Sequence, residues 1–285
     1  MPAAPALLLV SIGNTRTRFA SVESGQGADL RLEPSQVLTN DDPAAIARAI
    51  VAATGGTESP GGARIIVASV NHPAADKIEA ALADLPDADR VLRFGRDLAI
   101  PVVHTLDEEA AKTLGQDRLL DALGAYARSG QACIVIDAGT AVTVDFIDGE
   151  GTFHGGVIAP GVQMMLRALH EQTSALPLVT MSREVLPPIS EDAENKPAPF
   201  GRNTTEAIAR GVAGSIRGLA HLMIDQYAEF YEAYPRVIAT GGDAPLLFEN
   251  DQLIEAIVPD LTLIGMLEAV KRLDQMAEPD EDEGV

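Results

Sequence analysis

One short segment of this chain places a carboxylate, a glycine and two hydroxyl side chains close together. These residues are Asp137, Gly139, Thr140 and Thr143, within the sequence IVIDAGTAVTVD. Backbone N–H groups beside a glycine can approach a phosphate closely, and threonine hydroxyls can donate hydrogen bonds to it. A nearby aspartate can hold the cation that accompanies a nucleotide. The spacing therefore predicts a phosphate-binding turn.

The elements around this turn are readable as two strands. Cys133 to Ile136 is an uninterrupted apolar run rich in β-branched residues, as expected for a buried strand. After the turn at Asp137 to Thr140, Val142 to Phe146 reads as a second strand. The N-terminus repeats the pattern, since the apolar run Leu7 to Val10 leads through SIGNT into strand residues Arg16 to Val22. Two such hairpins, far apart in sequence, predict two lobes that close on one nucleotide.

Six further blocks accompany the two hairpins along the chain. The eight blocks are SIGNTRTRF (Ser11 to Phe19), VASV (Val67 to Val70), GQDRLLDALGA (Gly115 to Ala125), DAGTAVTVD (Asp137 to Asp145), GGVIAPG (Gly155 to Gly161), GRNTTEAI (Gly201 to Ile208), TGGDA (Thr240 to Ala244) and PDLTLIGM (Pro259 to Met266). In this order they resemble the type III pantothenate kinases, also described as the Bvg accessory factor family. That family shares its scaffold with the acetate and sugar kinases, Hsp70 and actin.

The resemblance implies an α/β fold of the two-lobed, actin-like (ribonuclease H-like) type, with the nucleotide cleft between the lobes. Alternation of short apolar strands with Ala-rich helical segments agrees with that class. A length of 285 residues, 46% of them hydrophobic, suits two cores. We expect an N-terminal lobe over residues 1–129, a C-terminal lobe over 130–277, and a disordered acidic tail over 278–285.

The activity implied by the resemblance is ATP-dependent phosphorylation of pantothenate, the first step of coenzyme A biosynthesis. Its cofactors would be ATP with Mg²⁺ and a monovalent cation, K⁺ or NH₄⁺. The residues that match the family's ATP-binding motifs are Ser11, Ile12, Gly13, Asn14, Thr15, Arg16, Thr17, Arg18, Gly139, Thr140, Thr143, Gly241 and Gly242. Those that match its substrate-binding motifs are Gly115, Gln116, Asp117, Arg118 and Thr204. Asp137 would hold the monovalent cation or help to hold magnesium.

Asp117 is the expected catalytic base. It stands at the start of a helical pattern, where its carboxylate could accept a hydrogen bond from a substrate hydroxyl and take its proton. Arg118 offers a rigid fork for a carboxylate. The alternative interpretation is an ordinary carboxylate at a helix N-terminus beside an exposed arginine.

Ser11 departs from the family pattern D-x-G-N-T, whose first residue is an aspartate. A serine can hydrogen-bond a phosphate oxygen or a metal-bound water but brings no negative charge, whereas Mg²⁺ usually relies on one or two carboxylates plus substrate phosphates. The substitution leaves a second hypothesis open: a catalytically weakened or silent paralogue that acts as a nucleotide or pantothenate sensor or accessory factor.

The segment after GGVIAPG reads as a helix, Val162 to His170, with Met164, Met165 and Leu169 facing inward. In the family this helix belongs to the two-fold interface, so the resemblance implies a homodimer with Met164 and Met165 as candidate contacts. The short strand before it is expected at Val157 to Ala159, bracketed by glycines.

Charge and composition bear on the remaining functional classes. The net charge of -21 disfavours nucleic acid and anionic membranes as partners. No run of about 18 apolar residues and no basic, apolar leader is present, which favours the cytoplasm. The single cysteine, Cys133, reads as a buried core residue, and the five histidines lack zinc-ligand spacing.

Overall fold

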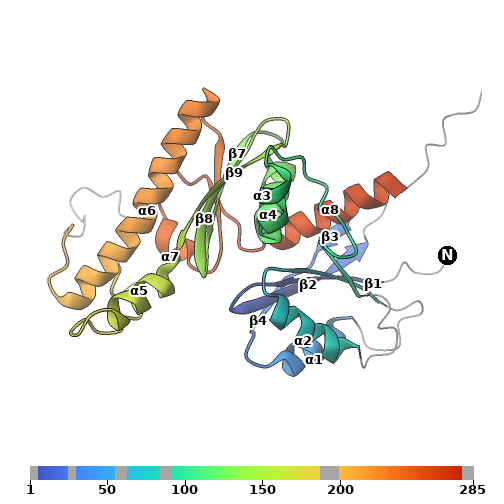
Figure 1. Cartoon of the computed structure of the whole chain (residues 1–285), viewed down its shortest axis with the longest axis horizontal. Helices are drawn as coiled ribbons and strands as arrows, with labels where there is room; N and C mark the ends of the chain where they lie inside the picture. The colour runs from blue at the N-terminus through green and yellow to red at the C-terminus, as the bar shows by residue number, and fades with distance from the viewer. Residues whose placement is uncertain (1–5, 25–29, 55–62, 84–90, 187–198, 278–285) are drawn as a thin grey trace, which may run out of the picture. The chain divides into compact units, whose positions relative to one another are not determined.

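The computed structural model describes residues 6–24, 30–54, 63–83, 91–186 and 199–277 (Figure 1). They form two compact units, each with its own sheet. The first contains residues up to Val102, Asp107–Ala127 and the chain from Asp260 onward, and the second contains Val103–Leu106 and Arg128–Pro259. The expected acidic tail lies outside the described residues.

The sheet of the first unit has strand order β3-β2-β1-β5-β6, with β4 paired to β2. Its strands are β1 (Ala6–Ile12), β2 (Arg16–Ser24), β3 (Leu30–Leu32), β4 (Gln36–Thr39), β5 (Ala63–Ser69) and β6 (Val91–Arg93). Its helices are α1 (Pro43–Ala53), α2 (His72–Leu82), α3 (Glu108–Thr113), α4 (Gln116–Ser129) and α8 (Leu261–Ala277). β1 and β2 form the expected antiparallel hairpin, and β5 and β6 add to it in parallel.

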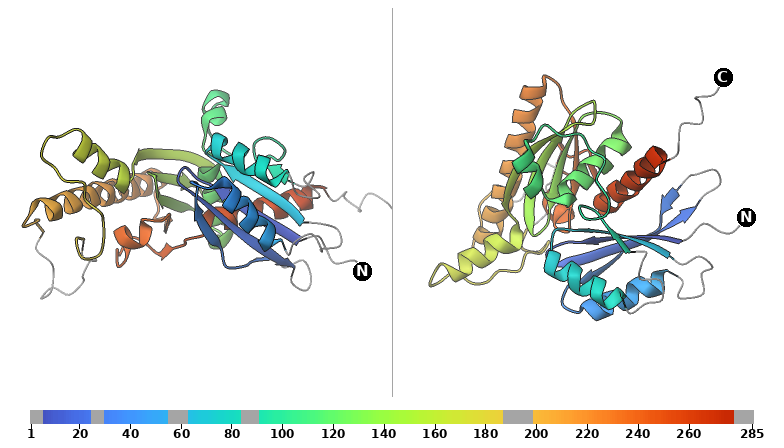
Figure 2. Two further views of the ribbon diagram at one scale, coloured as in Figure 1. Left: turned by 90° about the horizontal axis from the view of Figure 1, so that it is seen from below. Right: turned by 45° about the vertical axis from the view of Figure 1, so that its right-hand side comes forward.

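Both faces of this sheet are covered, because the strand residues that point to each face are apolar. α1 and α2 lie side by side on one face (Figure 1, Figure 2). Their residues Ile46, Ile50 and Ile78 belong to one buried cluster with Leu8 and Val10 of β1. On the other face, residues of α4 and α8 form a second buried cluster with Leu9 of β1 and Ile66 of β5. Side chains alternate between the faces of a strand, so β1 supplies both clusters.

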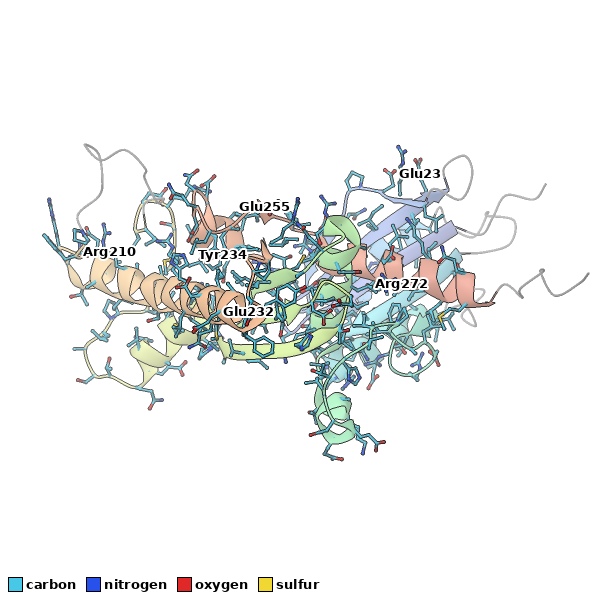
Figure 3. The ribbon with its side chains drawn as sticks, turned by 90° about the horizontal axis from the view of Figure 1, so that it is seen from above. Glu23, Arg210, Glu232, Tyr234, Glu255 and Arg272 are labelled. Carbon is cyan, nitrogen blue, oxygen red and sulfur yellow. The ribbon has the colours of Figure 1, made fainter. Side chains whose placement is uncertain are left out.

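The second unit has strand order β11-β10-β7-β8-β9. Its strands are β7 (Cys133–Ala138), β8 (Ala141–Ile147), β9 (Phe153–Pro160), β10 (Arg236–Thr240) and β11 (Ala256–Ile257). Its helices are α5 (Val162–Glu171), α6 (Thr204–Tyr231) and α7 (Ala244–Phe248). One face of the sheet carries a core shared with these three helices. α6 runs the length of this unit, as the labels Arg210 near its start and Glu232 just beyond its end show (Figure 3).

The C-terminal helix α8 belongs to the first unit. The two units therefore differ from two lobes that follow one another along the chain with a boundary at residue 129. The chain leaves the second unit at Pro259, and α8 then packs in the first unit. Leu263, Met266 and Val270 are fully buried there. Burial of these apolar side chains stabilises α8 in the first unit. A division of the chain into consecutive segments could not show this.

Two local expectations around α5 were wrong. Met164 does not face inward, since it is 48% exposed, whereas Val162 and Leu166 are buried and Met165 packs against the core. One residue is a rotation of about 100° around a helix, which is enough to turn Met164 out of the apolar side of α5 that Met165 joins. The preceding strand is also longer than expected. Gly156 lies within β9, where a Cβ would come 2.1 Å from the Val144 carbonyl oxygen.

Candidate active site

The turn between β1 and β2 is closed by a hydrogen bond from Gly13 N to Arg16 O, 2.9 Å long. Asn40 then holds it from the side. Its Nδ2 donates to Gly13 O at 2.8 Å, its Oδ1 accepts from the Thr17 hydroxyl at 2.8 Å, and its backbone N donates to Thr15 O at 3.0 Å. Asn40 therefore shapes the expected phosphate turn. Asn40 stands outside the motifs recognised in the sequence, two residues before Asp42, the N-cap of α1, and no local pattern indicated its role.

Ser11 and Arg18 are register partners on β1 and β2, so their side chains share one face. That face is the one covered by α4 and α8, because Leu9 and Ala20, two residues away on each strand, belong to that cluster. Arg18 makes an ion pair with Asp260, and the Ser35 hydroxyl donates to the same carboxylate at 2.7 Å. A phosphate at Arg18 would have to share its guanidinium with Asp260.

The expected catalytic block stands at the start of α4. Asp117 and Arg118 lie in the first turn of the helix, both partly buried, and Asp117 Oδ1 accepts from Arg118 N at 2.8 Å. A Cβ at Gly115 would lie 2.5 Å from the same oxygen, so any larger residue there would have to displace the Asp117 carboxylate from this position. The side chain of Gln116 is bonded to the ends of β5 and β6. Any substrate contact of Gln116 would therefore use its backbone.

In the second unit, Asp137 lies in a row of polar residues that crosses three strands. Thr143 of β8 and Thr240 of β10 are its register partners. The apolar neighbours Ile136, Ala138 and their counterparts on the adjacent strands point into the core, so this row lies on the opposite face. Asp137 and Thr143 were predicted from the sequence. That Thr240 lies next to Asp137 became evident only from the pairing of β10 with β7.

Two glycines press against the Asp137 turn. Gly241 has φ +91, and a Cβ there would lie 2.3 Å from Asp137 Oδ1 and 2.3 Å from Ala138 O. Gly161 approaches the other end of the same turn, where a Cβ would lie 2.1 Å from Gly139 O and 2.5 Å from Thr140 O. Gly241 and Gly161 thus let the backbone pass where a side chain could not.

Further backbone bonds stabilise the same turn. Gly139 N donates to Ala141 O at 2.9 Å, and Gly161 N donates to Thr140 O at 3.1 Å. Asp243 is the residue before α7, but it makes no side-chain cap bond to that helix; its N–H donates to Ala138 O at 2.9 Å. Gly242 stands between Gly241 and Asp243 in this segment.

The oxygen atoms around Asp137 limit the kinds of cation that could bind there. Within the described ranges, no three side chains of His, Cys, Asp or Glu gather in a way that could hold a metal ion. Asp137 instead has one carboxylate beside the backbone oxygens of its own turn. Such a set fits a weakly bound monovalent cation, or a Mg²⁺ held mainly by nucleotide phosphates, better than a protein-only magnesium cage.

Thr204 begins α6, whose N-terminus is capped by the side chains of Asn203 and Glu206. Asn203 Oδ1 accepts from Glu206 N at 2.9 Å, while the Glu206 carboxylate accepts from Arg202 N and Asn203 Nδ2, both at 2.9 Å. Thr204 itself is exposed. It lines a groove of about 980 Å³ between α5 and α6, together with Met165, Leu169 and Ile208.

Cys133, His154 and His221 make side-chain hydrogen bonds within the second unit. Burial raises the pKa of the Cys133 thiol, although a hydrogen bond with the Ser129 hydroxyl opposes the rise. His154 Nε2 lies 2.7 Å from Asp148 Oδ2, and His221 Nε2 lies 2.8 Å from Asp251 Oδ2. Each of these two histidines contacts one carboxylate. No helix among the described residues has the length and apolar character needed to span a membrane.

Two α/β units, each with an antiparallel hairpin at its start, define an α/β protein of the actin-like class. Solved structures with this fold include a conserved Baf family transcriptional activator from Campylobacter jejuni (TM-score 0.56, 19% identity, 94% of this chain and 99% of that one). Another is component A of the (R)-2-hydroxyglutaryl-CoA dehydratase of Acidaminococcus fermentans (TM-score 0.52, 14% identity, 96% and 100% coverage). At these identities the likeness concerns the fold alone.

The family is shown by sequence. Residues 7–226 match the family model described as type III pantothenate kinase. Relatives of that name include a Syntrophotalea carbinolica protein, 31% identical over 91% of this chain and 96% of its own length. A second, from Gluconobacter oxydans, is 32% identical over 91% of each chain. The protein belongs to the type III pantothenate kinase family, whose members are phosphotransferases.

Proposed function

We propose that this protein transfers the γ-phosphate of ATP to the primary hydroxyl of pantothenate, forming 4'-phosphopantothenate for coenzyme A biosynthesis. The observation that carries the proposal is the family match over residues 7–226. That range contains Asp117, Asp137 and Thr204, the residues on which the assigned chemistry depends. Relatives that cover nearly the whole chain are named as kinases, which favours catalysis over a silent paralogue.

We assign the proton-accepting role to Asp117. Phosphoryl transfer needs mainly alignment of donor and acceptor and neutralisation of charge. A carboxylate in the first turn of α4 is available to accept the proton of the attacking hydroxyl. Arg118, next to it, would pair with the carboxylate of pantothenate through its guanidinium fork, and Thr204 would contribute a hydroxyl to substrate.

ATP contacts are assigned to the β1–β2 turn, Ser11 to Arg18, and to Gly139, Thr140 and Thr143 of the second unit. Gly241 and Gly242 would lie beside the nucleoside. Asp137 would hold K⁺ or NH₄⁺, or share Mg²⁺ with the phosphates. With Asp137 and the phosphates as its ligands, magnesium would supply neutralisation of the phosphate charge. Because Ser11 brings no carboxylate, the protein would rely on Asp137 and the phosphates themselves to retain it.

We further propose that the protein is a cytoplasmic homodimer. The exposed side of α6 carries Gly211, Gly214 and Gly218, and, apart from the helix's own backbone, a Cβ at any of them would meet no atom of the described residues within 4 Å. A helix-interior glycine costs about 1 kcal/mol relative to alanine, and packing among the described residues of one chain does not require glycine at these three positions. Close packing of a second copy against this side of α6 would explain the three glycines. Gly211 also lines the groove, and Met164 of α5 is half-exposed and could join the same contact.

The activity is tested with purified protein, ATP, Mg²⁺, K⁺ and pantothenate, by following 4'-phosphopantothenate directly. Omission of pantothenate, and replacement of K⁺ by Na⁺, are the controls. Formation of product that depends on pantothenate supports the proposal. Nucleotide binding without product would overturn it.

The assembly is tested by light scattering across working concentrations. Gly214→Leu fills space that is open in the single chain, so it should leave the fold intact and weaken the dimer. Ala127→Leu adds the same side chain at an exposed position of α4 and serves as the control. A wild-type protein that remains monomeric would refute this part of the proposal.

A further inference from the structure

The side chain of Gln116 joins two strand ends to the start of α4. Its Nε2 donates to Phe94 O at 2.8 Å, and its Oε1 accepts from Ser69 N at 3.3 Å. Ser69 is the last residue of β5, and Phe94 directly follows β6. One amide thus uses its donor and its acceptor on two adjacent strands.

The space for this amide is made by Gly95. A Cβ at Gly95 would lie 2.2 Å from Gln116 Nε2 and 3.3 Å from its Cδ. Gly95 also has φ +79, a conformation that side chains of L-residues rarely adopt. Its N–H donates to Leu98 O at 2.8 Å, which stabilises the turn after β6. The absence of a side chain at Gly95 therefore leaves the space that the Gln116 amide fills.

The same connection continues to the phosphate turn. The Ser69 hydroxyl donates to Ile12 O at 3.3 Å, and Val70 N donates to the same oxygen at 3.2 Å. Ile12 directly precedes Gly13, which begins the turn closed by Gly13 N and Arg16 O. Within the first unit, a continuous set of hydrogen bonds thus runs from α4 through the end of β5 to the β1–β2 turn.

We propose that Gln116 is a positioning residue for Asp117, fixing where the first turn of α4 begins relative to the phosphate turn. The inference rests on the proposed function, since it takes Asp117 as the base. Asp117 follows Gln116 directly, so a shift of the Gln116 backbone moves the carboxylate with it. The amide does not touch substrate; it acts through the helix that carries Asp117.

Gln116→Met tests this role because methionine has a similar length and no amide. A misplacement of about 1 Å can cost roughly 100-fold in rate, so we expect kcat to fall by about 10- to 100-fold. The KM for ATP should stay within about twofold, since only uniform binding would change KM alone. Gln131→Met, at an exposed position after α4, is the matched control and should retain wild-type kinetics.

Gln116→Glu supplies a readout that loss of folding would not produce. A protonated carboxyl group can donate to Phe94 O and accept from Ser69 N, as the amide does, whereas the ionised form cannot donate. The kcat of this variant relative to wild type should therefore rise as pH falls. The corresponding ratio for Gln116→Met should be independent of pH.

These assays separate the possible failures. If Gln116→Met lowers the melting temperature but keeps wild-type kcat per folded molecule, or if the Gln116→Glu ratio does not change with pH, the positioning role is overturned while the kinase assignment stands. If the wild-type protein transfers no phosphate to pantothenate, the proposed function and this inference fail together.

Discussion

Gly241→Ala is expected to destabilise the second unit and to disturb the cation-binding turn. The backbone at Gly241 has φ +91, and the new Cβ would overlap both Asp137 Oδ1 and Ala138 O. Left-handed backbone costs an L-residue about 1–2 kcal/mol, and overpacking typically adds about 1–3 kcal/mol. The Ala138 carbonyl belongs to a paired strand and cannot move aside freely, so we expect a total loss of about 2–5 kcal/mol.

Gly130→Ala is the matched control for that variant. Gly130 has φ +63, but a Cβ there would meet nothing within 4 Å, so only the backbone strain of about 1–2 kcal/mol should appear. The free energies of unfolding are compared by urea denaturation at a common slope. We also expect Gly241→Ala to need more K⁺ for half-maximal activity, because the substitution displaces Asp137. Equal losses of stability in the two variants would refute the close contact as the cause.

The remaining predictions concern single side chains. Asp117→Asn should lower turnover by roughly two to four orders of magnitude with nucleotide binding nearly intact; near-normal turnover would exclude Asp117 as the base. Ser11→Asp should reduce the magnesium concentration needed for activity, because it restores a carboxylate, and titrations of both proteins with magnesium measure this; unchanged robust activity in both would show that Ser11 is irrelevant. Cys133 should resist thiol reagents in the folded protein and react once unfolded, as mass spectrometry can count, because burial raises its pKa. Burial raises the pKa of Asp148, but hydrogen bonds led by that of His154 outweigh it, so the net pKa lies below 3.8. The unfolded chain then binds more protons near and below pH 4, so this contribution to stability is present at neutral pH and lost as pH falls; Asp148→Asn should flatten that acid limb in urea titrations.

Local patterns in the sequence predicted the main elements closely. The strand expected at Val142 to Phe146 is β8, Ala141–Ile147, and the helix expected at Val162 to His170 is α5, Val162–Glu171. Both predictions are confirmed, because hydrophobic periodicity and turn residues act over neighbouring positions. The family was likewise readable from the ordered motifs, and the comparisons confirm it.

The sequence alone determined which side chains could bind phosphate, accept a proton or hold a cation, since those capacities belong to residue types and short spacings. The tertiary structure decided what holds them. Asn40 reaches back to the turn at Gly13, Asp260 pairs with Arg18, and Gly241 presses on Asp137, all across long sequence separations. The position of α8 in the first unit likewise depends on contacts between distant parts of the chain. Which apolar surfaces are buried together is decided when the chain folds, and no local sequence pattern specifies it.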